Sequence, residues 1–228
     1  MPAEDSYQAE RLRMVKNQIK GRGVRDARVL RAMQDVPRHV FVPAERRHLA
    51  YADGPLPIGG GQTISQPYIV ALMTELLELE GDETVLEVGT GSGYQAAVLS
   101  RLAAQVYTLE RIPELAEQAR LRLADLACTN VEVHVRDGSE GLSDHAPYDG
   151  ILVTAAAPRV PEALKAQLAD GGLLVLPVGG RAGQILERWR REGDSFQVER
   201  IAPVAFVPLI GSQGWDENES PDRWWRSG

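Results

Sequence analysis

From position 84 to position 177, short apolar runs alternate with segments in which apolar residues recur three and four positions apart. A short apolar run bounded by turn residues indicates a buried strand, whereas the longer spacing indicates one face of a helix. This alternation predicts an α/β fold with a largely parallel sheet. The expected strands are 84–88, 105–109, 131–136, 148–154 and 172–177, and the expected helices include 113–127 and 161–168.

The N-terminal part has a purely helical pattern. We expect a helix over 7–20 and a second one that Asp26 can cap and that Pro37 ends, with one face of the first helix formed by Leu12, Val15 and Ile19. A glycine-rich loop is predicted over 51–67, and it is too long to be a simple connection. Pro67 suits the first turn of the helix that follows.

The C-terminal part changes character again. Segments 184–191 and 196–207 are typical of two strands joined by a short polar turn, which predicts an antiparallel hairpin at the sheet edge. Residues 216–228 are acidic and aperiodic, so we predict a disordered tail, unless Trp224 and Trp225 dock on the body or a partner. The rest is expected to form one domain of three parts, 1–80, 81–180 and 181–215.

Gly89, Gly91 and Gly93 follow the apolar run 84–88 directly. Glycines at these positions let the backbone turn sharply and let a ligand lie against it, while the helix beginning near Ser92 directs free N–H groups toward that ligand. The segment predicts a site for a nucleotide-like cofactor. A strand, turn and helix without any ligand is the less favoured alternative, because glycines this dense weaken local structure.

Two acidic residues bear on which cofactor binds. Glu87, two residues before Gly89, would repel a pyrophosphate but suit a positive centre, which favours S-adenosylmethionine over a dinucleotide. Glu110 closes the next apolar run, where a carboxylate can accept hydrogen bonds from both ribose hydroxyls of either cofactor.

Composition and net charge argue against several classes of protein. With 228 residues, 43% of them hydrophobic, and no apolar run long enough to span a membrane, the chain is expected to be a globular cytoplasmic protein. The acidic N-terminus does not resemble a signal peptide. A net charge of −7 argues against nucleic acid as a partner. The single cysteine excludes an internal disulfide, and the four histidines show no metal-ligand spacing, so no metal site is expected.

Three separate parts of the chain resemble the protein-L-isoaspartate O-methyltransferase family. The similar segments are the pre-core loop 57–67, the first cofactor motif 85–94, and the later blocks 153–158, 174–179 and 206–209. The glycine motif is shared with many methyltransferases, whereas the Gln62-Thr-Ile-Ser65 loop is specific to this family. Two departures are visible: Arg136 stands where the family usually has glycine, and the tail after Trp215 has no counterpart.

The resemblance implies a class I S-adenosylmethionine-dependent methyltransferase fold, Rossmann-like and doubly wound, with N-terminal helices and an antiparallel C-terminal edge. It implies methylation of the free α-carboxylate of L-isoaspartyl residues in damaged proteins and peptides, with S-adenosyl-L-homocysteine as product, and we expect a monomer without nucleic-acid or membrane partners. The implied cofactor-binding residues are Gln62, Thr63, Ile64, Glu87, Gly89, Gly91, Ser92, Glu110, Asp137 and Gly138.

The substrate side of the resemblance involves the loop and a C-terminal segment. Ser65 is implied as the residue that holds the substrate carboxylate, although it could instead cap the helix at Pro67. Asp137 could likewise be a plain turn residue instead of reading the adenine. Asp53 matches the family loop without an evident role, and the segment implied to flank the peptide is Val207, Pro208 and Leu209. Rival functions are a small-molecule or RNA methyltransferase and a non-catalytic cofactor-binding protein.

Overall fold

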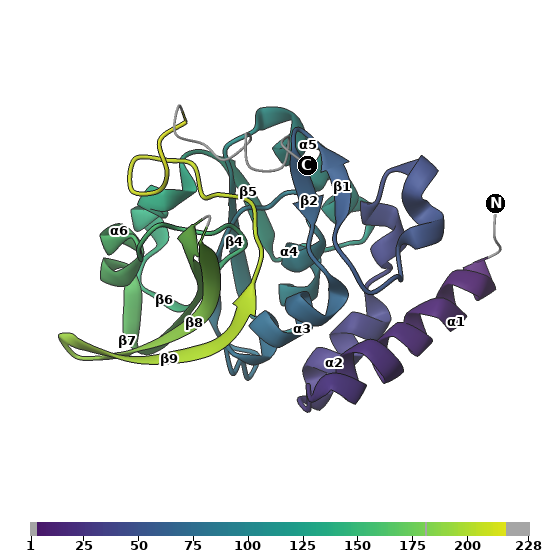
Figure 1. Ribbon diagram of the computed structural model, residues 1–228, viewed down its shortest axis with the longest axis horizontal. Helices are drawn as coiled ribbons and strands as arrows, with labels where there is room; N and C mark the ends of the chain where they lie inside the picture. The colour runs from purple at the N-terminus through teal and green to yellow at the C-terminus, as the bar shows by residue number, and fades with distance from the viewer. Residues whose placement is uncertain (1–3, 181, 218–228) are drawn as a thin grey trace.

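The computed structural model describes residues 4–180 and 182–217 (Figure 1). Within these residues, seven strands form one sheet in the order β5-β4-β3-β6-β7-β8-β9. The first five strands of this order are parallel, whereas β8 and β9 are antiparallel to their neighbours. The bounds are β3 Thr84–Val88, β4 Gln105–Glu110, β5 Val131–Val135, β6 Tyr148–Val153, β7 Leu168–Gly180, β8 Gly183–Glu192 and β9 Ser195–Val204.

The strand order changes direction between β3 and β6. From β3 the chain proceeds outward through β4 and β5, and it then returns to add β6 and β7 on the other side of β3. In open parallel sheets, ligands bind at such a switch point, beyond the carboxyl ends of the strands. The topology therefore places the expected site at the ends of β3 and β6.

Helices cover both faces of the sheet, and strand β3 has apolar side chains on each face. Val85 packs with the N-terminal helices, α3 (Pro67–Glu75) and α4 (Tyr94–Leu99), whereas Leu86 and Val88 pack on the other side with Leu164 of α6 (Glu162–Ala166). Helix α5 (Pro113–Asp125) contributes Leu123 to the first cluster. The expected doubly wound α/β fold is confirmed.

The N-terminal helix is less regular than the sequence predicted. Helix α1 spans Glu4–Met14 and continues as a π-helix (η1, Val15–Ile19) and a 3₁₀ turn (η2, Lys20–Arg22). Val15 and Ile19 are buried as expected, but Leu12 is 45% exposed and Met14 is buried in its place. The wider π-turn changes which residues face the core, so the regular helical spacing was wrong at Leu12.

Asp26 caps α2 (Ala27–Asp35) as predicted, since its carboxylate accepts hydrogen bonds from the backbone N–H groups of Arg28 and Val29. Two short 3₁₀ segments, η3 (Arg38–Phe41) and η4 (Ala44–Leu49), lead to the glycine-rich loop. Part of that loop is not irregular. It forms an antiparallel hairpin of β1 (Leu56–Gly59) and β2 (Gln62–Ile64), beside the main sheet, and α3 then begins at Pro67 as expected.

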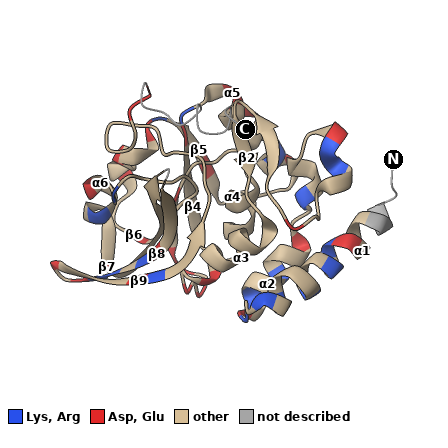
Figure 2. Ribbon diagram, viewed as in Figure 1, with Lys and Arg blue, Asp and Glu red and all other residues tan. Residues whose placement is uncertain are grey.

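The C-terminal hairpin is present, with β9 at the sheet edge (Figure 1). Strand β9 ends at Val204 rather than at Val207, because the following residues leave the sheet and bond to the segment after β6. Charges of both signs lie along β8 and β9 (Figure 2), where Arg188 pairs with Glu78 and Glu199. In the described part of the chain, no helix is long and apolar enough to cross a membrane.

Candidate active site

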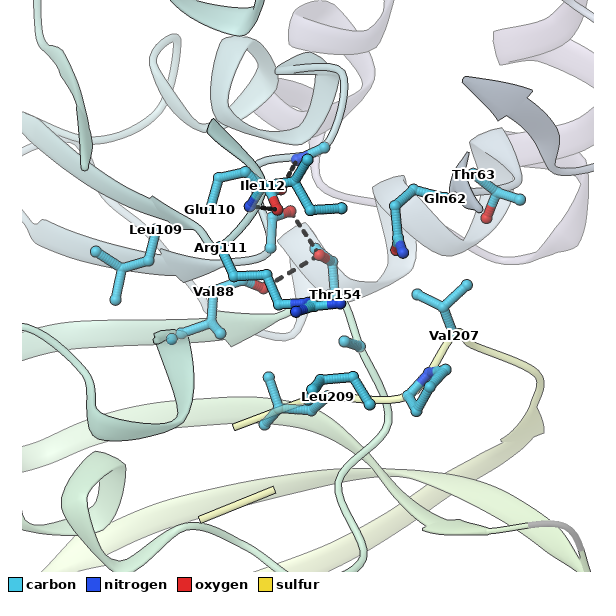
Figure 3. Close-up of a pocket in the computed structure, with 16 residues that line it drawn as sticks. Gln62, Thr63, Val88, Leu109, Glu110, Arg111, Ile112, Thr154, Val207 and Leu209 are labelled. Atoms are coloured by element: carbon cyan, nitrogen blue, oxygen red, sulfur yellow. Dashed lines mark hydrogen bonds between the residues drawn. The ribbon is translucent and has the colours of Figure 1, made fainter. Parts of the chain in front are cut away.

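The turn after β3 depends on a close contact between Gly89 and Thr154. Gly89 has a φ of +97°, and a Cβ atom there would overlap the Thr154 hydroxyl oxygen. Thr154 follows β6 and donates its hydroxyl to the carbonyl oxygens of Gly89 and Val88, at 2.7 and 3.1 Å (Figure 3). A residue with a side chain is therefore disfavoured both by its backbone conformation and by this contact.

Two adjoining cavities open at this turn. The first, shown in Figure 3, extends from the hairpin across the ends of β3 and β4 to the segment after β9. The second lies between β2 and the start of α4. Of the residues predicted to bind the cofactor, Gln62, Thr63, Gly89, Gly91, Glu110 and Gly138 line the first cavity, and Ile64 and Ser92 line the second.

Glu110 ends β4 and presents its carboxylate to the first cavity. The side chain is buried and accepts hydrogen bonds from the backbone N–H groups of Gly91 and Ile112, at 2.8 and 3.0 Å. Each carboxylate oxygen has a second lone pair, so the group can still accept hydrogen bonds from a bound ligand. The backbone contacts hold the carboxylate in a fixed position, which suits a pair of ribose hydroxyls.

Glu87 does not line either cavity. Its side chain is fully buried and accepts a 2.6 Å hydrogen bond from the Thr108 hydroxyl, while its Oε1 has no partner among the described residues. Burial raises the pKa of Glu87 to about 8, opposed by the Thr108 hydrogen bond. At neutral pH this carboxyl group is mainly protonated, so the expected attraction between Glu87 and a positive ligand has no support in the geometry. Glu87 is only two residues from Gly89, and for this reason the sequence did not indicate that its side chain points into the protein interior.

Asp137 and Gly138 have separate surroundings. Gly138 lines the first cavity, and a Cβ atom there would overlap Val88, so only glycine fits without adjustment. Asp137 instead accepts hydrogen bonds from Ser139 and from the backbone N–H of Ser212. Burial opposes its ionisation, but the hydrogen bonds from Ser212 and Ser139 outweigh that effect and lower its pKa. These contacts favour the turn interpretation, and adenine recognition by Asp137 stays a prediction.

The C-terminal segment 210–217 passes beside this part of the first cavity. Ser212 and Gln213 bond to Asp137 and Ser139, and the Trp215 indole donates to the carbonyl oxygen of Ala156. Glu217 reaches Arg111 at 3.2 Å, in an exposed ion pair that contributes little by itself. Residues 218–228, to which most of the predicted tail belongs, lie outside the described residues.

A groove with a volume of about 660 Å³ lies next to both cavities. Ser65 lines it, together with Arg22 and Tyr68, and residues 202–207 at the end of β9 form another part of its wall. Thr63 and Thr154 line the groove and both cavities. These two threonines therefore mark the point at which ligands held in the cavities and the groove would meet.

The alternative role of Ser65 as a helix cap is excluded. Gln66 is the N-cap residue of α3, and no side chain caps that helix end. The Ser65 hydroxyl has no hydrogen-bond partner in the described ranges, 4–180 and 182–217, so it is available to a ligand in the groove. The Gln66 side chain instead bonds to Asp53, which also pairs with Arg22. Asp53 thus has a structural role, because it connects two residues of the groove wall.

The segment Val207–Leu209 borders the first cavity, and its first residue also borders the groove. The Val207 carbonyl accepts a hydrogen bond from the N–H of Ala156, and the Leu209 N–H donates to the carbonyl of Ala156, both at 2.8 Å. These two groups are therefore already paired. A bound peptide would need to use other groups of the segment or the outer edge of β9.

Sequence reasoning did not single out two residues that the structure brings to the site. Thr154 lies at the carboxyl end of β6, the neighbour of β3, and this position was itself a usable signal. No pattern in the sequence indicated Arg22, which is 43 positions before Ser65. Its guanidinium reaches the groove by stacking on the Tyr68 ring, 3.7 Å from the ring centroid.

A parallel sheet with a glycine turn at its switch point, a carboxylate at the end of the next strand and an antiparallel edge defines a class I S-adenosylmethionine-dependent methyltransferase fold. The family model described as protein-L-isoaspartate (D-aspartate) O-methyltransferase matches residues 9–214. The chain therefore belongs to this family.

Individual relatives agree with this assignment. A protein-L-isoaspartate O-methyltransferase from Methanoregula boonei is 59% identical over 207 residues, which cover 91% of this chain and 95% of the relative. One from Roseiflexus sp. is 57% identical and covers 89% of this chain and 93% of the relative.

Solved structures agree as well. A protein-L-isoaspartate O-methyltransferase has a TM-score of 0.81 at 28% identity, with 91% of this chain and 67% of that chain covered. A beta-aspartate methyltransferase from Plasmodium falciparum, in complex with S-adenosyl-L-homocysteine, has a TM-score of 0.77 at 25% identity and covers 88% of this chain and 98% of that chain.

Glu110→Gln should weaken the binding of S-adenosylmethionine about tenfold or more, because it replaces charge-assisted hydrogen bonds by neutral ones and turns an amide N–H₂ toward a backbone donor. Isothermal titration calorimetry measures this affinity. Glu114→Gln, an exposed change in the first turn of α5, is the matched control and should bind as the wild type does. Equal affinities of the two variants would contradict the role of Glu110.

Glu87→Gln should change how stability depends on pH. The folded-state pKa of Glu87, about 8, lies above its ordinary value of 4.5. The contribution of the protonated Glu87 side chain to the free energy of unfolding is therefore fully present below pH 4.5, and it is lost as the pH rises through 8. The slope is at most about 1.4 kcal/mol per pH unit. Urea unfolding at pH 5 and pH 8 should show that the variant gains stability relative to the wild type at the higher pH. An equal difference at both pH values would show that Glu87 ionises normally.

Proposed function

We propose that the chain transfers a methyl group from S-adenosyl-L-methionine to the free α-carboxylate of L-isoaspartyl residues in peptides and proteins. The observation that carries this proposal is the meeting of the two cavities and the groove at Thr63 and Thr154. A methyl donor in the cavities and a peptide in the groove would be in contact there. Membership of the family supplies the substrate class.

The cofactor side fits the residues present. Glu110 offers a fixed carboxylate with free lone pairs, and the glycine at position 138 keeps the cavity wall clear of side-chain atoms. When bound, S-adenosylmethionine supplies a methyl group on a positively charged sulfur. The residues Gln62, Thr63, Ile64, Gly89, Gly91 and Ser92 are proposed to surround it, and its adenine is proposed to lie near Gly138.

The substrate side requires orientation rather than proton transfer. A carboxyl group with a pKa near 4 is already ionised at about pH 7, so it can attack the methyl carbon without a general base. Ser65 is proposed to hold this carboxylate by donating its unused hydroxyl, and Val207, Pro208 and Leu209 are proposed to flank the peptide. The sheet edge at β9 can bind an extended chain by backbone hydrogen bonds.

The methyl ester product leads to repair through ordinary peptide chemistry. The backbone nitrogen that follows the modified residue attacks the ester carbonyl, methanol leaves, and a succinimide forms. Hydrolysis of the succinimide returns some normal aspartate, so repeated cycles convert isoaspartyl residues to aspartyl residues. Methylation alone is the enzyme's step, and the later steps require none of its residues. That the protein works in the cytoplasm as a monomer, without nucleic acid, stays a prediction.

Incubation with methyl-labelled S-adenosylmethionine and an isoaspartyl peptide should transfer label to the peptide as a base-labile ester. Ser65→Ala should lower the rate roughly tenfold or more, since a hydrogen bond to a charged group is lost, while cofactor affinity stays within about twofold. Ser143→Ala, at an exposed position that lines neither cavity nor the groove, is the control and should keep the wild-type rate.

Absence of labelled ester in the wild type would contradict the proposed function, and a wild-type rate in Ser65→Ala would remove that residue from the mechanism.

A further inference from the structure

A second cluster of reactive side chains lies on the edge strand β5, away from the cavities and the groove. Side chains alternate along the strand, so Val131 and Val133 border a cavity on the α5 side while Glu132 and His134 face the opposite side. His145, in η6 (Ser143–His145), reaches the same face and stacks on the ring of Tyr107, with 4.1 Å between the ring centroids. Tyr107 is the register partner of Glu132 on β4.

The donor atoms of this cluster converge. One ligand atom each of Glu132, His134 and His145 lies within 4.8 Å of the others. The Glu132 Oε2 and His134 Nε2 atoms are 3.8 Å apart, which is too far for a hydrogen bond. His134 Nε2 is buried and has no hydrogen-bond partner among the residues that the structure describes. A buried polar atom without a partner is unfavourable, and a ligand would satisfy it.

The orientation of Glu132 is fixed from outside the cluster. Gln105 Nε2 donates a 3.2 Å hydrogen bond to Glu132 Oε1, which leaves Oε2 on the side of His134. Partners of this kind orient metal ligands in known sites and contribute to their affinity. The ring of Tyr107 has the corresponding effect on His145, because stacking restricts the imidazole to one plane.

We propose that Glu132, His134 and His145 form a binding site for a divalent transition-metal ion such as Zn²⁺. Two imidazoles and one carboxylate match the ligands of four-coordinate zinc sites in which three positions are taken by protein side chains and the fourth by water. Ligand atoms about 2.0 to 2.1 Å from Zn²⁺ lie roughly 3.3 Å apart in a tetrahedron, so the side chains need to move by about 1 Å. Glu132 and His145 are exposed, on the edge strand and a short turn, so their side chains can make that adjustment.

Ligand chemistry, rather than nearby charge, decides which ions can bind. Glu132 acts electrostatically on His134 with the opposite sign to His145, Arg136 and Arg120, so charges of both signs surround the site. Binding depends on direct coordination, and it favours ions that accept nitrogen ligands over Mg²⁺ and Ca²⁺, which prefer oxygen ligands.

A bound ion would join β5 to η6 and thereby brace the intervening chain. That chain includes Gly138, which lines the first cavity, although none of the three ligands lines either cavity or the groove. Methyl transfer itself therefore does not require the ion. The expected consequence is added stability, because a ligand that binds only the folded state shifts the unfolding equilibrium.

The test is Zn²⁺ binding to the untagged protein by isothermal titration calorimetry, with thermal unfolding as a second readout. The wild type should bind one Zn²⁺ ion per chain and unfold at a higher temperature in its presence. Loss of a group outside the ligands costs about 10- to 100-fold in metal affinity at characterised sites, so His134→Ala and His145→Ala should each lose at least that much.

Two control variants separate this site from other zinc-binding groups. His48→Ala removes an exposed histidine in η4, and Cys128→Ala removes the single thiol; both should bind Zn²⁺ as the wild type does. All variants should keep wild-type methyl transfer, which also shows that they fold. The proposal is overturned if the wild type binds no Zn²⁺, if binding survives in His134→Ala and His145→Ala, or if it is lost in a control.

Discussion

The hydrogen bond from the Thr154 hydroxyl to the Gly89 carbonyl joins the carboxyl ends of β3 and β6. It can form only because Gly89 has no Cβ atom and adopts a positive φ. The same turn directs the Gly91 N–H toward Glu110, at the end of β4. Three strand ends are thus connected through one short segment of backbone, and the two cavities take their shape from it.

This arrangement also determines where substrate chemistry can occur. Thr63 and Thr154 line the cavities and the groove alike, so a peptide in the groove would meet a methyl donor beside these two residues. Asp53 holds the groove wall through side-chain contacts with Gln66 and Arg22, and the Ser65 hydroxyl has no hydrogen-bond partner among the described residues. Rigid positioning is what a reaction without proton transfer needs most.

The sequence predicted the α/β fold, the strands of the parallel sheet, the cap at Asp26 and the family, because each depends on a local pattern or a motif. It failed where tertiary contacts decide. Leu12 is exposed because a π-turn changes the helix face, and Glu87 points into the interior although it precedes the glycines directly. His134 and His145 show no ligand spacing in the sequence, but the return of the chain through η6 brings them together with Glu132.

We propose that position in the groove, not acidity, selects the substrate. Normal aspartyl and isoaspartyl residues offer carboxylates of similar pKa, and they differ only in where one methylene lies. The most direct measurement is therefore kcat/KM for two peptides that are identical except for this linkage. A misplacement of about 1 Å can cost roughly a hundredfold in rate, so the aspartyl peptide should be slower by at least that factor. Comparable values for the two peptides would contradict it.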